Sequence, residues 1–407
     1  MRKHTFAMAA GAALLLACGS LFANGSAEPA SSASSSASSS KRPSVKIGFI
    51  GPLTGDNSSY GILQLQADQL ALEEYNANPN HKLDITLVVE DSEGSQEKAL
   101  ASIQKLDTSD KIAVLQGPVF TGPAFTVGDY CEDVKLAMIS GSASHKDITK
   151  DKTYVFRTTV SDGLQGEVAG KYFYEVLGYK KLGILYAMND YSVGLRDGMK
   201  AAFEADGGKV TAEETCQVGD KDFRTQLTRL RDADVEAIYV PNYTVEIAQI
   251  LVQAKELGIT KPFLSGDGFS NPQVHDLSNN NTHGVVYIAS PESKDSPLKT
   301  QFEEAYTKKY NIAPDAFAHN SYDATNIIIA ALERAYEKEG KFNRTTVRNE
   351  IAATKDFQGV NGTMNFQPNG DLVAYEGVYK VEGNDRASET YQGTYGVDAS
   401  GKLVKIE

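Results

Sequence analysis

The 407-residue chain has no tryptophan and only three cysteines, Cys18, Cys131 and Cys216. Neither the cysteines nor the six histidines have the spacing of a metal site, so we expect no metal and no cofactor. A disulfide would be possible in an oxidising compartment. We expect none, because Cys131 lies in a helical pattern and Cys216 in a strand-like stretch that we place in a different lobe.

Motifs of common enzyme classes are also missing. The first strand is not followed by a GxGxxG motif, and the loop Gly51–Gly55 lacks the Lys-Ser/Thr pair of a phosphate-binding loop. The chain has no GxSxG elbow and no HExxH helix. With 53 acidic and 40 basic residues, the net charge of −13 argues against nucleic acid or anionic lipid as partner. We expect a binding protein for a small molecule, not an enzyme.

The N-terminal residues have the pattern of an export signal. Arg2 and Lys3 precede an apolar run that is too short to span a bilayer stably, so 1–17 is predicted to be a signal peptide. Leu15-Leu16-Ala17-Cys18 resembles a bacterial lipobox, which predicts acylation of Cys18; ordinary cleavage near Ala23 is the alternative. The serine-rich stretch 18–42 is predicted to be a tether, which places the folded part in the periplasm or at the cell surface.

Strand and helix patterns alternate over most of the remaining chain. Strands are predicted at 45–50, 84–90, 112–115, 136–139, 182–187, 235–240, 262–265 and 284–288. Helices are predicted at 60–76, 95–107, 121–133, 164–177, 192–205, 222–231 and 244–257, with a further long helix at 315–339. This alternation predicts an α/β fold of two similar doubly wound lobes with parallel sheets, joined by a hinge that the chain crosses several times.

Extended segments near 155–163 and 286–292 indicate where the chain crosses between the lobes. We predict an N-terminal lobe of 43–160 plus 291–340 and a C-terminal lobe of 161–290 plus 341–407. The segment 386–407 is expected to pack on the second lobe or the hinge. Open α/β sheets bind ligands at the carboxyl ends of their strands, so a ligand is expected in the cleft between the lobes.

Nine short motifs occur in one order over residues 44–385. They are IGFIGPLTG…YG at 47–61, LQGPVFTGPAFTV at 115–127, LAMISGSAS at 136–144, LYAMNDYSVG at 185–194, KDF at 221–223, VPNYTVE at 240–246, LSGDGFSN at 264–271, YDAT at 322–325 and FQGVNGTMNFQPNGD at 357–371. In this order they resemble type I periplasmic binding proteins, specifically the branched-chain amino acid (Leu/Ile/Val) binding family of ABC transporters. No cysteine pair corresponds to the disulfide usual in that family's first lobe.

The resemblance implies a site for an amino acid. The α-carboxylate would be held by Thr121 and by the loop residues Ser142, Ala143 and Ser144, and Thr121 also has the sequence context of a helix N-cap. Plain capping at Thr121 and a generic Gly/Ser loop at 142–144 are the alternatives. Asp267 would hold the α-ammonium group, although a Gly-flanked aspartate is also common in turns. Three residues would form aromatic walls: Tyr60, Tyr191 and Tyr243.

The implied function is the capture of an amino acid, branched-chain or similarly aliphatic, for delivery to the permease of an ABC importer. The protein is expected to be a monomer that touches the membrane only through its lipid anchor. Two alternatives stay open. Members of the wider family bind amides, urea or aromatic acids, and the same fold serves as a ligand-binding sensor.

Overall fold

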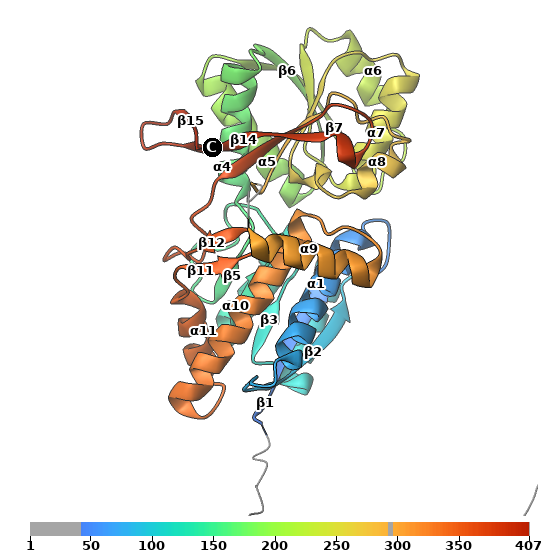
Figure 1. Cartoon of the computed structure of the whole chain (residues 1–407). Coiled ribbons are helices and arrows are strands. Elements are labelled where there is room, and N and C mark those ends of the chain that lie inside the picture. The colour runs from blue at the N-terminus through green and yellow to red at the C-terminus, as the bar shows by residue number, and fades with distance from the viewer. Residues whose placement is uncertain (1–41, 292–295, 407) are drawn as a thin grey trace, which may run out of the picture. The chain divides into compact units, whose positions relative to one another are not determined.

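Two open sheets of largely parallel strands form the framework of the computed structural model, which describes residues 42–291 and 296–406 (Figure 1). These described residues form one compact unit. The predicted signal peptide, the tether and Cys18 lie outside the described residues. Among the residues that the structure describes, no helix is long and apolar enough to cross a membrane.

The first sheet contains five parallel strands in the order β2-β1-β3-β4-β5. Their bounds are β1 Ser44–Gly51, β2 Asp84–Asp91, β3 Val114–Gln116, β4 Met138–Ser140 and β5 Val155–Arg157. Ile47 in β1 packs on one face with α10 residues such as Ile327 and with Val347 of α11. Ile50 packs on the other face with Ile103 of α2 and Val127 of α3. Burial on both faces explains the continuous apolar runs in these strands.

The second sheet has the order β15-β14-β13-β10-β9-β8-β6-β7. Its parallel part contains β6 Lys181–Ala187, β7 Lys209–Cys216, β8 Ala237–Val240, β9 Phe263–Ser265 and β10 Val286–Ala289. Its antiparallel edge contains β13 Glu376–Val381, β14 Glu389–Val397 and β15 Leu403–Lys405. The order β7-β6-β8-β9-β10 repeats the order β2-β1-β3-β4-β5, so the two lobes are doubly wound in the same way.

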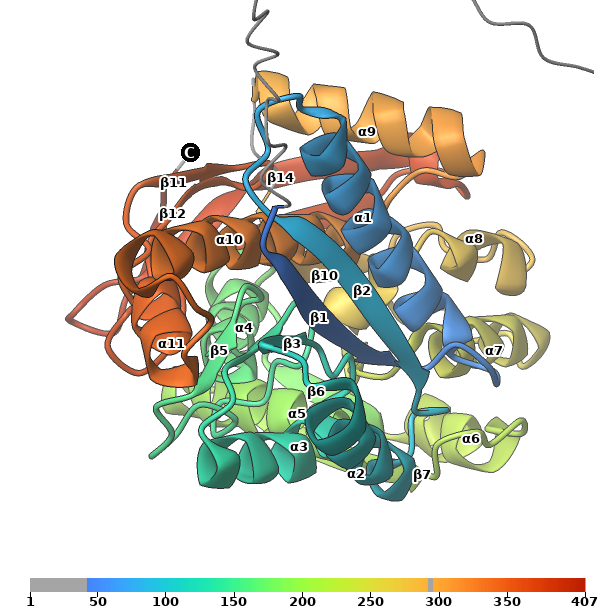
Figure 2. The same cartoon turned by 90° about the horizontal axis from the view of Figure 1, so that it is seen from below.

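Helices cover both faces of each sheet (Figures 1 and 2). Those of the first lobe are α1 Ser58–Ala77, α2 Gln96–Lys105, α3 Thr121–Val134, α9 Pro297–Tyr310, α10 Ala316–Glu339 and α11 Arg344–Ala352. Those of the second lobe are α4 Asp162–Lys171, α5 Asp190–Ala205, α6 Arg224–Asp232, α7 Thr244–Glu256 and α8 Gln273–Leu277. α2 and α4 each continue into a π-helical turn, at Leu106–Asp110 and Tyr172–Val176.

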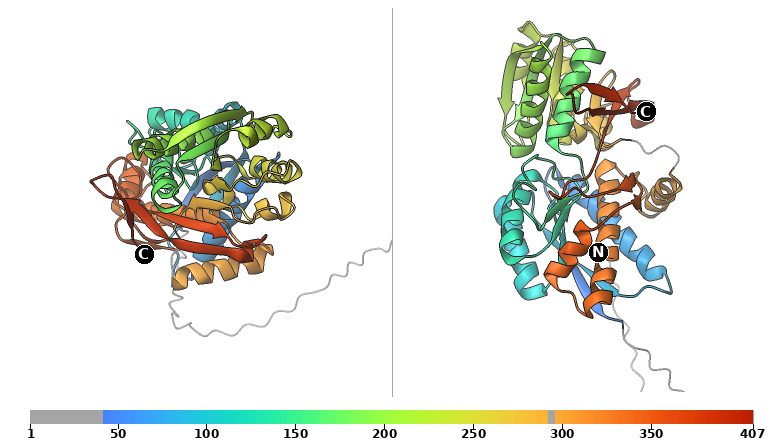
Figure 3. Two further views of the ribbon diagram at one scale, coloured as in Figure 1. Left: turned by 90° about the horizontal axis from the view of Figure 1, so that it is seen from above. Right: turned by 90° about the vertical axis from the view of Figure 1, so that its left-hand side faces the viewer.

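The C-terminal part of the chain departs from the prediction. Residues 341–407 were expected in the second lobe, but α11 and the hairpin of β11 Phe357–Gly359 and β12 Gly362–Met364 lie beside the first lobe (Figures 1 and 3). Val347, Ile351 and Met364 belong to the same core cluster as Ile47. Only from β13 onward does the chain join the second sheet. The apolar face of α10 is long enough to bury α11 as well, which keeps this segment in the first lobe.

Cys131 and Cys216 are both buried and both free. Cys131 lies in the core between the first sheet and α3, and Cys216 lies in the core around α6 and α7. Burial raises the pKa of the Cys216 thiol to about 12, so it stays protonated and unreactive at neutral pH.

Candidate functional site

The predicted site residues all lie where strands end at their carboxyl side. Tyr60 stands in the first turn of α1, after β1, and Thr121 begins α3, after β3. The loop 142–144 follows β4. In the second lobe the corresponding positions after β6, β8 and β9 hold Tyr191, Tyr243 and Asp267. One small cavity brings five of the predicted residues together with other residues of both lobes: Tyr60, Val119, Phe120, Thr121, Ser142, Tyr191, Tyr243, Gly268 and Phe317.

Ala143, Ser144 and Asp267 do not line that small cavity. Asp267 is nevertheless joined to it, because Tyr191 Oη donates a hydrogen bond to Asp267 Oδ1 at 2.6 Å. Ser144 is fully buried, and its hydroxyl lies beside the Asp162 carboxylate without a hydrogen bond of good geometry among the described residues. The predicted set is therefore brought to one region, with these three residues set deeper than the rest.

The loop after β4 is held by its own hydrogen bonds. Ser142 Oγ donates to the carbonyl oxygen of Val119 at 2.6 Å and accepts from Gln64 Nε2 at 3.0 Å. The backbone N–H of Ala143 donates to Ser140 Oγ at 2.9 Å. The Ser142 hydroxyl and the Ala143 N–H are thus engaged within the protein, which leaves the Ser144 hydroxyl as the unpartnered donor of the loop.

Thr121 is the first residue of α3, and the N-cap position belongs to Phe120. The prediction that Thr121 caps this helix is wrong, because the backbone leaves its extended conformation one residue earlier than the sequence pattern indicated. The first N–H groups of a helix have no intrahelical acceptor. Thr121 and Gly122 therefore offer two backbone donors at the positive end of the helix dipole, which suits a carboxylate.

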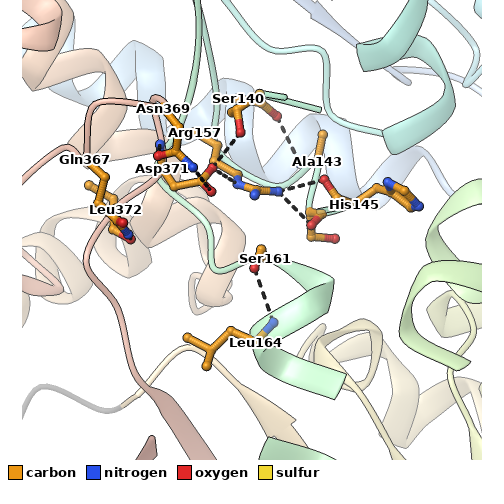
Figure 4. Close-up of polar contacts among 12 residues, drawn as sticks. Ser140, Ala143, His145, Arg157, Ser161, Leu164, Gln367, Asn369, Asp371 and Leu372 are labelled. Carbon is orange, nitrogen blue, oxygen red and sulfur yellow. Dashed lines mark hydrogen bonds and ion pairs between the residues drawn. The ribbon is translucent and has the colours of Figure 1, made fainter. Parts of the chain in front are cut away.

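Arg157 was not predicted, although it fixes the loop that follows β4 (Figure 4). Its guanidinium is fully buried, and its Nη1 donates to the carbonyl oxygens of Ser144 at 2.7 Å and His145 at 2.8 Å. Its Nε donates to Asp371 at 2.7 Å. A charged residue in the otherwise apolar strand Val155–Arg157 was the only signal in the sequence.

The second-lobe wall centres on the Asp267 carboxylate. The backbone N–H of Asp267 donates to Gln165 Oε1 at 3.0 Å, and the N–H of Gly268 donates to Tyr191 Oη at 2.9 Å. Burial raises the pKa of Asp267 to about 6, although hydrogen bonds with Tyr191 and Gln165 lower it. Near neutral pH the site therefore presents an oriented carboxylate that is not paired with a cation of the protein.

Aromatic rings fill the space between the two walls. Tyr191 stacks on Tyr243 with ring centroids 4.9 Å apart, and Tyr243 lies 4.6 Å from Phe120. Tyr60 packs against Phe317 at 5.5 Å. Sequence reasoning missed Phe120, which lies after β3, and Phe317, which lies in the first turn of α10, since a phenylalanine at either place is indistinguishable from ordinary core.

The two lobes touch directly at Tyr60. Its hydroxyl lies 2.7 Å from Thr244 Oγ1 and donates to the carbonyl oxygen of Gly268 at 3.0 Å. The cavity beside it has only about 10 Å³ of accessible space, whereas the adjoining cleft past Phe120 and Tyr243 holds about 570 Å³. An amino acid can enter only if the lobes separate at Tyr60, a motion that a multi-crossing hinge permits.

The model of the family described as periplasmic binding protein matches residues 44–387. The chain belongs to this family. Leu/Ile/Val-binding protein BraC3 of Rhizobium johnstonii is 28% identical over 341 residues, which cover 83% of this chain and 92% of that protein. The predicted family and fold are confirmed.

Two solved structures resemble this periplasmic binding protein along most of its length. Leucine-binding protein LivK from Thermotoga maritima is 28% identical, with a TM-score of 0.79, and the match covers 86% of this chain and 98% of that one. LivJ from Streptococcus pneumoniae, solved in complex with isoleucine, is 27% identical, with a TM-score of 0.79, over 89% and 99% of the two chains.

This periplasmic binding protein has two further carboxylates beside Asp267 that sequence reasoning missed. Asp162 and Glu376 are both fully buried. The Ser144 hydroxyl lies beside Asp162 and the Gln165 side chain beside Glu376, without hydrogen bonds of good geometry. Burial, and next to it the charge of Asp267, raises the pKa of both groups. Asp162 begins the helix after the first crossing and Glu376 begins β13, so neither stands at a predicted strand end.

Proposed function

We propose that this protein captures an α-amino acid, branched-chain or similarly aliphatic, in the cleft between its lobes and delivers it to the permease of an ABC importer. One observation carries the proposal. A wall of N–H and hydroxyl donors on the first lobe faces a wall with an oriented carboxylate, Asp267, on the second. An α-amino acid has the two opposite charges that such a pair of walls would hold.

The first-lobe wall suits the α-carboxylate. The backbone N–H groups of Thr121 and Gly122 lie at a helix N-terminus, where N–H groups have no intrahelical acceptor, and the Ser144 hydroxyl has no hydrogen bond of good geometry among the described residues. Arg157 holds the carbonyl side of the loop, so Ala143 and Ser144 keep one orientation without a ligand's help. Such preorganisation lowers the entropic cost of binding.

The side chain of the ligand would contact the aromatic rings. Tyr60, Tyr191 and Tyr243, together with Phe120 and Phe317, present ring faces that suit an apolar group of a few carbons. The relatives named Leu/Ile/Val-binding protein and the neighbour solved with isoleucine support this choice.

Delivery would follow from closure. Tyr60 reaches Thr244 and Gly268 only when the lobes are together, so the closed form has a surface that the open form lacks. A permease that recognises this surface would receive the loaded protein selectively. We also propose that Cys18 carries the lipid anchor and that the protein works as a monomer at the outer face of the membrane.

The test is a thermal-shift screen of the purified protein, unfolded and refolded to remove carried ligand, against the amino acids, urea and short amides. A ligand that binds only the folded state at one hundred times its Kd adds about 2.7 kcal/mol of stability. We expect shifts with leucine, isoleucine or valine, and none in Asp267→Ala. As a matched control, Asp276→Ala removes a carboxylate outside the cleft and should keep the shift.

The outcomes separate the alternatives. A shift with amides or urea alone would contradict the amino acid proposal and remove Asp267 from its role. Palmitate labelling of the wild type, absent in Cys18→Ser, tests the anchor. Delivery is tested in cells that lack the protein: uptake of labelled leucine should return when the wild-type gene is supplied. A protein that binds leucine but does not restore uptake would favour a sensor.

A further inference from the structure

A further cavity lies between the lobes, beside Ser290 and Pro291, where the chain leaves β10. It has about 250 Å³ of accessible space. The first lobe contributes residues of α9, α10 and the turn between β11 and β12, and the second lobe contributes residues of β10, β13 and β14. None of the described residues that line it also lines either of the two cleft cavities, so it is a separate site.

Two buried donor atoms at this cavity lack an acceptor. They are Arg386 Nη1 and Ser270 Oγ, and neither makes a hydrogen bond of good geometry with the described residues. The guanidinium of Arg386 is nevertheless fixed in place, because its Nη2 donates to the carbonyl oxygen of Pro314 at 2.8 Å. A buried donor without an acceptor is costly. An acceptor group supplied by a ligand would remove that cost.

α10 brings the positive end of a long helix to the same cavity. This helix has 24 residues, and its first residue, Ala316, lines the cavity. The N-cap side chain of Asp315 accepts the N–H of Ala318 at 2.7 Å. The N–H groups of Ala316 and Phe317 have no intrahelical acceptor, and the helix dipole favours negative charge beside them. Lys299 of α9 adds a second positive side chain to the lining.

The carboxylates that line the cavity are engaged with donors of the protein. Glu303 Oε1 lies 2.9 Å from Nε2 of His319. Glu389 Oε2 accepts from Tyr287 Oη at 3.0 Å, and Glu389 Oε1 lies 2.9 Å from Nε2 of His275. The negative groups therefore have partners, whereas one guanidinium nitrogen and one hydroxyl at the cavity do not. This imbalance favours an anionic ligand over a cationic one.

Tyrosine rings form the apolar part of the lining. Tyr287 stacks on Tyr379 with ring centroids 5.0 Å apart, and Tyr391 lies 5.2 Å from Tyr379. The hydroxyl of Tyr379 donates to the carbonyl oxygen of Ser290 at 2.8 Å, and the hydroxyl of Tyr287 donates to Glu389. Because these hydroxyls are engaged, the cavity meets the rings themselves, and a flat apolar group packs well against aromatic rings.

We propose that this cavity binds a small carboxylic acid with a flat aromatic body, at a site distinct from the amino acid cleft. The carboxylate would accept hydrogen bonds from Arg386 Nη1 and Ser270 Oγ beside the N-terminus of α10. The ring would pack on the three tyrosines. An inorganic anion would use only the charged end of the cavity and would leave the rings uncovered.

Such a ligand would contact both lobes, so it would also act on their closure. Arg386 follows β13 in the second lobe, and its partner Pro314 precedes α10 in the first. Opening would move the lining residues of one lobe away from those of the other, so the acid would bind the closed form better. By linkage, it would raise the affinity for the cleft ligand by the same factor by which that ligand raises its own. This coupling, unlike the site itself, rests on the proposed function.

Calorimetry with three matched probes tests the site: phenylacetate, its uncharged amide, and acetate, which lacks the ring. We expect phenylacetate to bind wild type about tenfold more tightly than either of the others. Arg386→Met should weaken phenylacetate binding about 10- to 100-fold, and Ser270→Ala about 5- to 10-fold. Arg334→Met is the matched control, because Arg334 also donates to a backbone carbonyl at 2.8 Å, that of Glu350, but does not line the cavity. It should bind phenylacetate as wild type does.

The serine variant separates binding from a structural role. The Ser270 hydroxyl has no hydrogen bond of good geometry to lose among the described residues. Ligand-free Ser270→Ala should therefore unfold at the temperature of wild type or above it, while binding phenylacetate less tightly. Unchanged phenylacetate affinity in both Arg386→Met and Ser270→Ala would overturn the site. Equally tight binding of the amide, or binding of inorganic phosphate without binding of phenylacetate, would overturn the proposed class of ligand.

Titration of leucine with and without saturating phenylacetate tests the coupling. Leucine affinity should rise about fivefold in wild type and stay unchanged in Arg386→Met. If phenylacetate competes with leucine and Arg386→Met does not weaken it, phenylacetate occupies the cleft, and the further site is overturned while the proposed function stands. Phenylacetate binding that depends on Arg386 but leaves leucine affinity unchanged would support the site and overturn its coupling to closure.

Failure of the proposed function would be recognised separately. If leucine, isoleucine and valine do not bind, but phenylacetate binding still depends on Arg386 and Ser270, the branched-chain proposal is wrong and the further site is supported.

Discussion

The two walls of the cleft are built in opposite ways. On the first lobe the polar groups are engaged with one another: Ser142 with Val119 and Gln64, and Arg157 with two carbonyl oxygens. On the second side the carboxylates of Asp162 and Glu376 are fully buried and make no ion pair and no hydrogen bond of good geometry with the described residues. The first wall is held by the protein's own hydrogen bonds, whereas the second contains buried carboxylates that form no ion pair with the described residues.

The difference shows how the energy of binding is distributed. Satisfied hydrogen bonds hold the first wall in place and add stability to the fold. Ionised buried carboxylates reduce the stability of the fold, and the ammonium group that we propose Asp267 binds would offset part of that cost. Changes in the first wall should therefore damage folding and binding together, while changes in the second should affect them in opposite directions.

The largest effect is expected from Arg157→Met. The substitution leaves the Asp371 carboxylate and the carbonyl oxygens of Ser144 and His145 without their donor. Removing one partner of a buried ion pair costs about 3–5 kcal/mol. The free energy of unfolding, measured in urea, should fall by that amount, and leucine affinity should fall with it. Arg157→Lys keeps the charge but loses the planar set of guanidinium donors, so its free energy of unfolding should lie between those of wild type and Arg157→Met. If Arg157→Met were as stable as wild type, the first wall would not be preorganised by Arg157.

A smaller loss is expected from Asp323→Asn, which tests the contrast between paired and unpaired acids. Asp323 is as buried as Glu376, but it accepts from the backbone N–H groups of Val360 at 2.8 Å and Asn361 at 3.1 Å. An amide cannot accept both, so the variant should lose about 1–3 kcal/mol. Glu376→Gln, measured beside it, should change stability with the opposite sign. If Asp323→Asn and Glu376→Gln change the free energy of unfolding in the same direction, Glu376 is an ordinary structural group like Asp323.

Most of the parallel strands could be predicted from sequence, whereas the parallel edge strand β7 and the antiparallel strands could not. β1, β6 and β8 are buried on both faces, so they read as apolar runs. β7 alternates between exposed and half-buried residues, because it lies at the sheet edge and lacks such a run. The antiparallel strand β14 contains Thr390, Gln392 and Gly393, which resemble a loop unless a partner strand is known.

The predictable part of the site is the part that follows strand ends. Asp267 and Tyr191 were found because motifs fix their positions in the chain, and the structure joins them by a hydrogen bond. Arg157 and Asp371 are 214 positions apart, and no local pattern connects them. Glu376 is hidden for the same reason, because it begins β13, an inner strand whose partners β10 and β14 no local pattern identifies.

Acid should stabilise the ligand-free protein down to about pH 4 to 5. Burial raises the pKa of Asp267 to about 6 and of Asp323 to about 7, above the ordinary value of 3.8. The two acids add fully to the free energy of unfolding below the pKa that they have in the unfolded chain. This contribution is lost as the pH rises through the higher pKa that they have in the folded protein. For Asp267 the loss between pH 5 and 7 is about 1 kcal/mol.

Scanning fluorimetry across pH 4 to 8 measures this effect. At the acidic end the trend should reverse. Hydrogen bonds lower the pKa of Asp91 and of Glu132 despite partial burial, so the protein loses stability when these two carboxylates become protonated. Saturating leucine should move the optimum to higher pH, since the ammonium favours ionised Asp267. Asp267→Asn should flatten the slope between pH 5 and 7; an unchanged slope would assign the effect to acids outside the cleft.

The smallest effect is expected from Tyr60→Phe, which removes the hydroxyl that joins the two walls. That hydroxyl contacts Thr244 and the carbonyl oxygen of Gly268 across the cleft. The loss of about 0.5–1 kcal/mol should come from the closed form alone. Small-angle scattering should then show a larger radius of gyration without ligand, and leucine should bind about two- to fivefold more weakly.

Tyr306→Phe is the matched control for this prediction. Tyr306 is fully buried and its hydroxyl also makes two contacts, with the carbonyl oxygen of Leu63 and with Gln66, but both lie within the first lobe. Its loss should lower stability by a similar amount without changing the radius of gyration or leucine affinity. If both variants change the radius alike, Tyr60 has no special part in closure; if neither does, closure depends on the ligand and the carboxylate wall instead.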